Sequence, residues 1–469
     1  MTLTEIRLPT QSNPAKFGPG GATRLVNCFV EDAGEEGKMR FPIYSNPGFD
    51  TWVSLSGYGI VRAAIVVNGA IYAVAGQKAI KVNSFGGVSE LGTVGGPDLT
   101  KLVTMDANRV GEIGICVDGF FYVVDTADSD AFSAVTTNVL PNVVAYAVHD
   151  GYGVLLTDEG TFQLTAVDIA TSVSALDNAA ASADRDGGNM VAVRNRDLVL
   201  FGPNSIEFWG NTGDTFPYSR TSSATGPDAG CLAPQSVAVF AQTMAYVASD
   251  RTVRALNGYT PTRISSHAVE RSIESDPNPE RITAHAWTFE GHTRYQINGT
   301  GYSWVYDAGL QRWFEVESYG IGSSLAGVYV NLDGRHIFGG TTTGVLYERG
   351  NDYLTEAGSP IVWKVQLAPV HSFPSELVFH ALYIDIMTGA APDPVTEPML
   401  MLDWSDDGGS TWSTQRIISL GKQGARRKTI TARRLGKAPP QGRIFRLSGS
   451  AASATCLLDV RPDVEVLRA

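Results

Sequence analysis

The stretch DLVLFGPNSIEFWGNTGD, residues 197–214, alternates apolar and polar side chains on both sides of a cluster of turn-forming residues. The alternation breaks at Pro203 and Asn204 and resumes from Ile206 to Trp209. A period of two on both sides of such a cluster is typical of two antiparallel strands joined by a tight turn. The stretch therefore predicts a β-hairpin.

Similar hairpins recur along the chain, as in AAIVVNGAIYAVAG, EIGICVDGFFYVVD and GVLLTDEGTFQLTAV. The second turn residue of each falls at positions 69, 119, 160, 204, 250, 299 and 344. The gaps are 50, 41, 44, 46, 49 and 45 residues, and a four-stranded propeller blade takes about 40 to 50. The series predicts an all-β fold that contains a six- or seven-bladed β-propeller, in which the opening hairpin marks one blade.

The composition agrees with many short strands packed around large cores. Of the 469 residues, 43% are hydrophobic and 18% are charged, and 50 are glycines that interrupt the apolar stretches every few positions. These values argue against a disordered chain and against a coiled coil. The four cysteines are far apart in apolar surroundings and form no C-x-x-C pair, which predicts free buried thiols and not a zinc site or a disulfide framework: Cys28, Cys116, Cys231 and Cys456.

Two segments lie outside the hairpin series. We predict an N-terminal β segment over 1–58, the propeller over 59–355 and an antiparallel β platform domain over 356–469. The N-terminal segment could also add strands to this platform domain. Prolines are disfavoured inside central strands, and three of them mark a long loop between strands of the last domain: Pro392, Pro394 and Pro398.

The chain is acidic overall, but one part of it is basic. The net charge is −12, yet residues 408–458 contain ten Lys or Arg and no Asp or Glu, which leaves about −22 on the remainder. Such a split indicates two surfaces with different partners. We give two hypotheses the same weight for the basic residues of this segment: they form a contact surface for an acidic partner or nucleic acid, or they form a plain solvated face. The residues are Arg426, Arg427, Lys428, Arg433, Arg434, Lys437 and Arg443.

The sharpest local motif is SDDGGSTW, residues 405–412, which fits the Asp-box pattern S-x-D-x-G-x-T-W. In that pattern the Asp caps the turn of a hairpin and the Trp packs beneath it, so we expect a structural role. A sialidase-like glycosidase would need several boxes and an arginine cluster, for which Arg7 alone is a poor anchor. The pattern residues are Ser405, Asp407, Gly409, Thr411 and Trp412.

No catalytic, cofactor or metal set emerges from the remaining polar residues. The histidine pairs His285/His292 and His371/His380 lack metal-ligand spacing, and DRDGGN at 184–189 suits a plain turn better than a calcium loop. No Ser/His/Asp or Cys/His set can be assembled without free choice among dozens of residues. We therefore expect no enzyme activity, no cofactor and no metal, and keep a sialidase-like glycosidase and a monomeric glycan-binding propeller as alternatives.

Three stretches carry a resemblance to a known family: LVNCFVE followed by YSNPGF, RNRDLVLFGPNSIEFWGNTGD, and WSDDGGSTWS followed by ARRLGKAPPQGRIFRL. On these the chain resembles the tail nozzle or hub proteins of short-tailed bacteriophages (podoviruses), also called packaged-DNA stabilisation or tail accessory proteins. The middle stretch is the most specific, because a strand pair of the form RD-apolar-FG-x-x-SIE-aromatic before a TGD-like turn recurs in that family.

The resemblance implies a structural protein of the virion tail, synthesised in the host cytoplasm. It implies a hexameric ring of this chain below the portal and adaptor (head-to-tail connector) rings, which extends the channel for double-stranded DNA, retains packaged DNA and docks a fibre, spike or needle protein. No membrane insertion is expected, since no apolar run approaches the roughly 20 residues of a spanning helix. For the basic segment we favour an acidic protein partner over DNA, because a channel that gripped phosphates would slow DNA exit.

Overall fold

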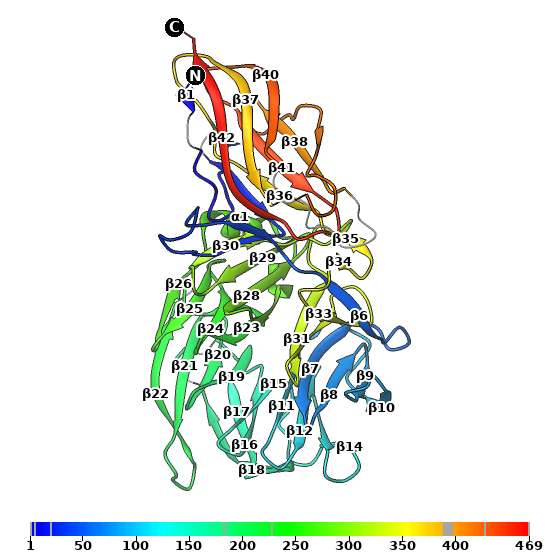
Figure 1. The fold of residues 1–469 in the computed structure, drawn as a ribbon. Coiled ribbons are helices and arrows are strands. Elements are labelled where there is room, and N and C mark those ends of the chain that lie inside the picture. Colours follow the sequence, from blue (N-terminus) through cyan, green and yellow to red (C-terminus); the bar gives the residue numbers. More distant parts are fainter. Residues whose placement is uncertain are drawn as a thin grey trace.

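The computed structural model describes residues 2–3, 6–18, 21–181, 183–184, 186–226, 228–387, 397–425 and 428–467. Within these ranges nearly all regular structure is β, as predicted. The described helices are α1 (His267–Ser275) and the 3-10 turn η2 (Pro279–Arg281). In Figure 1 a ring of small sheets forms the lower part of the molecule, and a second β domain that holds β1 and β42 forms the upper part.

Seven four-stranded antiparallel units follow one another in the described residues, and we number them in chain order. The first three are β7 (Val61–Val67), β8 (Ala70–Ala75), β9 (Lys78–Val82) and β10 (Val88–Thr93); β11 (Val103–Ala107), β12 (Glu112–Val117), β13 (Phe120–Asp125) and β14 (Ala131–Ala134); and β15 (Val143–His149), β16 (Tyr152–Thr157), β17 (Thr161–Ala166) and β18 (Ile169–Ala180). The next three are β19 (Met190–Arg194), β20 (Asp197–Phe201), β21 (Ser205–Asn211) and β22 (Tyr218–Thr225); β23 (Cys231–Phe240), β24 (Thr243–Ala248), β25 (Val253–Asn257) and β26 (Thr260–Arg263); and β27 (Thr283–Phe289), β28 (His292–Gly299), β29 (Tyr302–Asp307) and β30 (Arg312–Glu315). The seventh joins β31 (Ala326–Leu332), β32 (Arg335–Gly340) and β33 (Val345–Arg349) to β6 (Phe49–Ser54).

The first strands of the units contact one another in cyclic order, and β31 of the seventh unit returns to β7 of the first. The closing strand comes from far away in the sequence, because β6 pairs with β33 through partners such as Leu346 and Val53. This pairing covers the edge of the seventh unit, and exposed strand edges are sites of unwanted pairing. The seventh unit therefore depends on the N-terminal part of the chain.

The opening hairpin is the β20–β21 pair, with Asp197 opposite Gly210 and Phe201 opposite Ile206. Its alternate side chains pack on two different neighbours. Leu198 and Trp209 join a core shared with the third unit, whereas the neighbouring side chains Val199 and Phe208 join a core shared with the fifth. A unit is thus apolar on both faces, so we expect each unit to need its neighbours in order to fold.

One predicted hairpin is out of phase with the other six. The turn at Asn68 and Gly69 joins the first and second strands of its unit, whereas the turns near 119, 160, 204, 250, 299 and 344 join the second and third. The equivalent turn in the first unit lies at Gly76 and Gln77. Counted from Gln77, the gap to Gly119 falls to 42 residues, which brings the first unit into line with the others.

The second domain is a sandwich of two sheets with strands from both ends of the chain. One sheet contains β4 (Cys28–Val30), β5 (Ile43–Ser45), β42 (Cys456–Val466), β37 (Leu377–Ile386) and β40 (Ile430–Ala438), with β1 (Thr2–Leu3) beside β42. The other contains β3 (Ala22–Val26), β36 (Trp363–Gln366), β41 (Ile444–Gly449), β38 (Met399–Ser405) and β39 (Arg416–Ser419), with β2 (Asn13–Pro14) beside β3. Side chains of both sheets meet in one core that includes Leu382 and Val460 from the first sheet and Leu402 and Phe445 from the second.

The two domains share one sheet. A parallel bridge between Val26 and Glu315 joins β3 to β30, so one sheet runs from the sixth unit into the sandwich. Strands of the segment 1–58 lie in both sheets of the sandwich and in the seventh unit. The bounds 1–58, 59–355 and 356–469 remain a prediction.

Two further features of the sequence can be located. All four cysteines are buried and free of disulfides, as predicted. Of the three prolines assigned to the long loop, Pro392 and Pro394 lie outside the described residues, and Pro398 directly precedes β38.

Candidate functional site

The Asp-box residues lie together at the end of β38, where the chain turns toward β39. The Ser405 hydroxyl donates to Asp407 Oδ1 at 2.7 Å and accepts from the Gly409 N–H at 2.8 Å. Thr411 donates its N–H to Asp407 Oδ1 at 2.9 Å and its hydroxyl to Oδ2 at 2.6 Å. These bonds, first those from Thr411, hold the pKa of Asp407 well below its usual range. The turn is therefore organised around one charged carboxylate.

The half-buried Trp412 is held by a cation–π contact. The guanidinium carbon of Arg446 lies 3.8 Å from the centre of the Trp412 ring. Arg446 also donates to both carboxylate oxygens of the buried Asp403, at 2.9 Å from Nε and 2.6 Å from the terminal nitrogen. The box thus anchors a loop to β38 and β41, which is a structural arrangement.

Arg443 does not belong to the basic surface to which the sequence assigned it. Its side chain is 2% exposed, and it donates to both oxygens of Asp406 at 2.7 and 2.8 Å and to the carbonyl oxygens of Leu435 and Lys437. Its guanidinium also lies 5.2 Å from the ring centres of Phe379 and Trp404. The assignment is corrected because a count of charges along the chain treats buried and exposed arginines alike.

The other described basic residues surround β40, the edge strand of its sheet. Arg433 and Arg434 have exposed side chains, and their carbonyl oxygens accept hydrogen bonds from Arg416 at 2.7 and 2.9 Å. Lys437 pairs with Glu376, and the Lys428 ammonium donates to Ser419 at 2.8 and 2.9 Å. Arg426 and Arg427 lie outside the described residues. The structure therefore places two exposed arginines side by side on a sheet edge.

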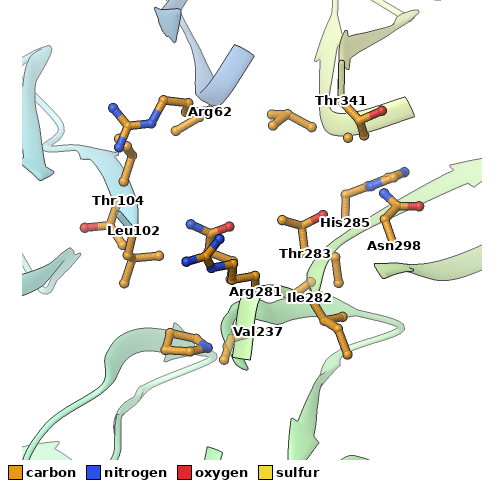
Figure 2. A pocket seen from close by; sticks show the side chains of 18 of the residues that line it. Arg62, Leu102, Thr104, Val237, Arg281, Ile282, Thr283, His285, Asn298 and Thr341 are labelled. Carbon is orange, nitrogen blue, oxygen red and sulfur yellow. The ribbon is translucent and has the colours of Figure 1, made fainter. Parts of the chain in front are cut away.

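A cavity of about 880 Å³ lies on the axis of the ring and is lined by the first strands of all seven units. Arg62 is fixed there by hydrogen bonds to the carbonyl oxygens of Gly76 and Lys101, at 3.0 and 2.7 Å. Burial lowers the pKa of His285 to about 3, so this ring is neutral at pH 7. In Figure 2 one side of the cavity shows Arg62, Leu102 and Thr104, the opposite side shows His285, Asn298 and Thr341, and Arg281, Ile282, Thr283 and Val237 lie between them.

Sequence reasoning did not single out the arginines of this cavity. Arg62 lies in β7, the first strand of the first unit, and Arg281 lies just before β27, the first strand of the sixth unit. No motif surrounds either residue. Among the described residues, no group of three or more His, Cys, Asp or Glu side chains could hold a metal ion. None of the helices in the described ranges is long and apolar enough to cross a membrane.

Two family models match the chain in succession. The model described as "Bacteriophage P22 Gp10, beta-propeller" matches residues 39–352, which include β6 and all seven units. The model described as "Bacteriophage P22 Gp10, beta-sandwich" matches residues 365–465. No curated protein sequence matches the chain.

Similar solved structures include virginiamycin B lyase from Staphylococcus aureus, at 10% identity and a TM-score of 0.43, which covers 62% of this chain and 94% of that chain. A streptogramin B lyase structure has 10% identity and a TM-score of 0.44 and covers 69% of this chain and 98% of its own. A chain of the mitotic checkpoint complex has 11% identity and a TM-score of 0.44, with coverages of 64% and 90%. Similarity at this level gives no ground for an argument about function.

Proposed function

The chain belongs to the bacteriophage P22 Gp10 family of tail-associated structural proteins, and from this premise we propose that it is the tail nozzle, or hub, of a short-tailed phage virion. The observation that carries the proposal is the succession of the two family matches, propeller then sandwich, over most of the chain. We infer a non-enzymatic role in the virion tail, after synthesis in the host cytoplasm and without membrane insertion.

We interpret the seven four-stranded units as seven blades of a closed propeller. The cyclic contacts between first strands and the pairing of β6 with β33 support this count. A strand from outside the array that completes the last blade is a common solution to ring closure, because it removes the free edge.

We propose that six copies form a ring below the adaptor, and that the exposed arginines on the β40 edge face an acidic surface of the neighbouring subunit or of the adaptor. The charge distribution supports this, because the exposed Arg433 and Arg434 would repel their own copies in a ring unless an acidic surface lay close by, and the chain outside residues 408–458 is strongly acidic. If the arginines instead form a solvated face, they would still have a role, because charged side chains on an edge strand discourage unwanted strand pairing.

We further propose that the ring extends the DNA channel, retains packaged DNA and supports a fibre, spike or needle protein. A mostly acidic lumen repels phosphates and so lets DNA slide. If the basic edge faced the channel instead, DNA retention would depend steeply on salt.

The first experiment measures oligomeric state by size-exclusion chromatography with light scattering, for the chain alone and with its adaptor. We expect a ring, or a ring that forms on the adaptor. A strictly monomeric chain that does not join the adaptor would contradict the proposal, and so would cleavage of sialosides by the pure protein, which would favour the glycosidase alternative.

The second experiment tests the basic edge. Arg433→Ser with Arg434→Ser should weaken ring assembly or adaptor docking, whereas Arg196→Ser, an exposed arginine in the turn between β19 and β20, should not. DNA retention in finished particles is measured separately. Normal assembly with DNA leakage would assign the arginines to DNA, and no change in either would leave a solvated face.

A further inference from the structure

A small cavity lies where the sandwich meets the sixth and seventh units. Its volume is about 10 Å³, which is the room that one water-sized occupant needs. Residues of the N-terminal segment line one side, and residues of the two units line the other. The lining residues that matter for its chemistry are Phe29, Asn46, Trp287, Arg294, Gln296 and Arg349.

Three of these residues bring N–H donors that have no acceptor among the residues that the structure describes. Arg294 is 3% exposed and, within the described residues, its guanidinium makes no hydrogen bond; Asp307 Oδ2 lies 4.0 Å from its Nε. Arg349 is 7% exposed, and one terminal nitrogen reaches the Pro47 carbonyl at 3.3 Å while its Nε has no partner in the described chain. The Trp287 indole N–H, in a residue that is 3% exposed, is likewise without an acceptor there.

Three of the acidic side chains around the cavity are engaged by other partners. Asp307 binds His292 Nδ1 at 2.6 Å and accepts two backbone N–H groups. Glu31 lies 3.6 Å from His292 Nε2, and Glu290 accepts from Asn351. Burial raises the pKa of Glu356 while the nearby Arg349 opposes that shift, and one of its carboxylate oxygens has no hydrogen-bond partner in the described chain.

The two arginines remain charged at neutral pH in spite of their burial. Burial lowers the pKa of Arg294 to about 10, and burial together with repulsion by Arg294 lowers the pKa of Arg349 to about 9. Aromatic faces compensate in part, since Phe29 lies 4.5 Å from the Arg294 guanidinium and Phe49 lies 5.1 Å from that of Arg349. Buried N–H donors without acceptors are nevertheless costly and rare in folded proteins.

We propose that this cavity holds one chloride-sized monoatomic anion, bound by Arg294, Arg349 and Trp287, which links the sandwich to the propeller. In the described chain, the buried side-chain atoms without partners in the residues that line the cavity are the Nε atoms of Arg294 and Arg349 and the indole nitrogen of Trp287, and all three are donors. A monoatomic anion can accept all of them at once, whereas a water molecule would also need acceptors for its own two hydrogens. The proposal is independent of the tail role, because it rests only on contacts within one chain.

The test measures thermal stability of the full chain at a constant ionic strength of about 0.15 M, as sodium gluconate is replaced by sodium chloride or sodium bromide. Gluconate is too large for the cavity. Because the anion binds only the folded state, we expect Tm to rise by a few degrees and to saturate with halide. Crystals grown in bromide should show an anomalous peak between Arg294 and Arg349. Equal Tm values in all three salts, or no bromide peak, would overturn the proposal and leave a bound water.

Variants separate the site from general salt effects. Arg294→Met should abolish the difference between chloride and gluconate, whatever its own Tm. Trp287→Phe keeps an aromatic ring and removes one donor, so it should raise the half-effect chloride concentration by about threefold to tenfold. Arg312→Met, at an exposed arginine of the same unit, should respond to chloride like the wild type. A full chloride response in Arg294→Met would contradict the site.

Discussion

The seven units and the sandwich are both antiparallel β structures, but they draw their strands from very different distances along the chain. In a unit, partners such as Leu200 and Glu207 are only a short turn apart in sequence. In the sandwich, β5 pairs with β42, so that Ile43 lies opposite Leu457. Local pairs cost little loop-closure entropy and carry turn signals, whereas distant pairs carry none. The comparison teaches that local patterns predict the strand pairing of the propeller, whereas for the sandwich they predict a β domain but not which strands pair.

The seventh unit combines local strand pairs with one distant pair, between β6 and β33. Removal of β6 is the change for which we expect the largest loss of stability. A fragment 46–358 retains β6 for the seventh unit, whereas a fragment 59–358 does not. We expect the shorter fragment to lose cooperative melting and to be cleaved much faster by protease, because β33 loses its partner strand and the buried side chains of Leu346 and Tyr347 are uncovered. Equal melting of the two fragments would show that local pairing alone maintains the ring.

The next largest effect compares two arginines of the sandwich. Arg443→Met leaves the carbonyl oxygens of Leu435 and Lys437 without their donor and removes the ion pair with the exposed Asp406, so we expect a loss of about 2 to 4 kcal/mol in the free energy of unfolding. Arg433→Met, on the exposed edge, should change it by less than about 0.5 kcal/mol. Urea denaturation followed by tryptophan fluorescence measures both. Similar losses in the two variants would contradict the different burial of the two side chains.

Much of the fold could be predicted because the propeller strands pair with neighbours in sequence and the turns between them have recognisable residues. Asp118 and Gly119, for example, both have positive φ, as the commonest two-residue hairpin turns require. The role of β6 had no such signal, since Phe49–Ser54 looks like any other short strand and its partner lies nearly 300 residues away. The burial of Arg443 could have been suspected from Asp406. This acid occupies a variable position of the Asp-box pattern, so the pattern gives it no role, and it was free to pair with an arginine.

A pair of glycines tests the same contrast on a smaller scale. A Cβ on Gly48 would lie 2.0 Å from the carbonyl oxygen of Thr355, a contact between distant segments, whereas one on Gly119 would meet nothing within 4 Å. Gly48→Ala should therefore cost more stability than Gly119→Ala, for which we expect about 1 to 2 kcal/mol from the positive φ alone. Thermal melting compares the two, and an equal or larger effect at Gly119 would contradict the importance of the distant contact.

The smallest effect concerns the Asp-box, a local motif inside the nonlocal domain, and it depends on pH. The hydrogen bonds to Asp407 lower its pKa in the folded state, so its charged form adds stability at every pH above the unfolded pKa of about 4. As pH falls below that value toward the lower folded pKa, the contribution is lost, because the unfolded state takes up the proton first.

Asp407→Asn should therefore lower Tm at pH 7 and approach the wild-type Tm as the pH drops below about 4. The matched control is Asp214→Asn, in the turn between β21 and β22, which should follow the wild type at both pH values. A Tm difference for Asp407→Asn that stays constant from pH 7 down to pH 3 would mean that the box is held by the shape of its glycine turn and not by the charge of the carboxylate.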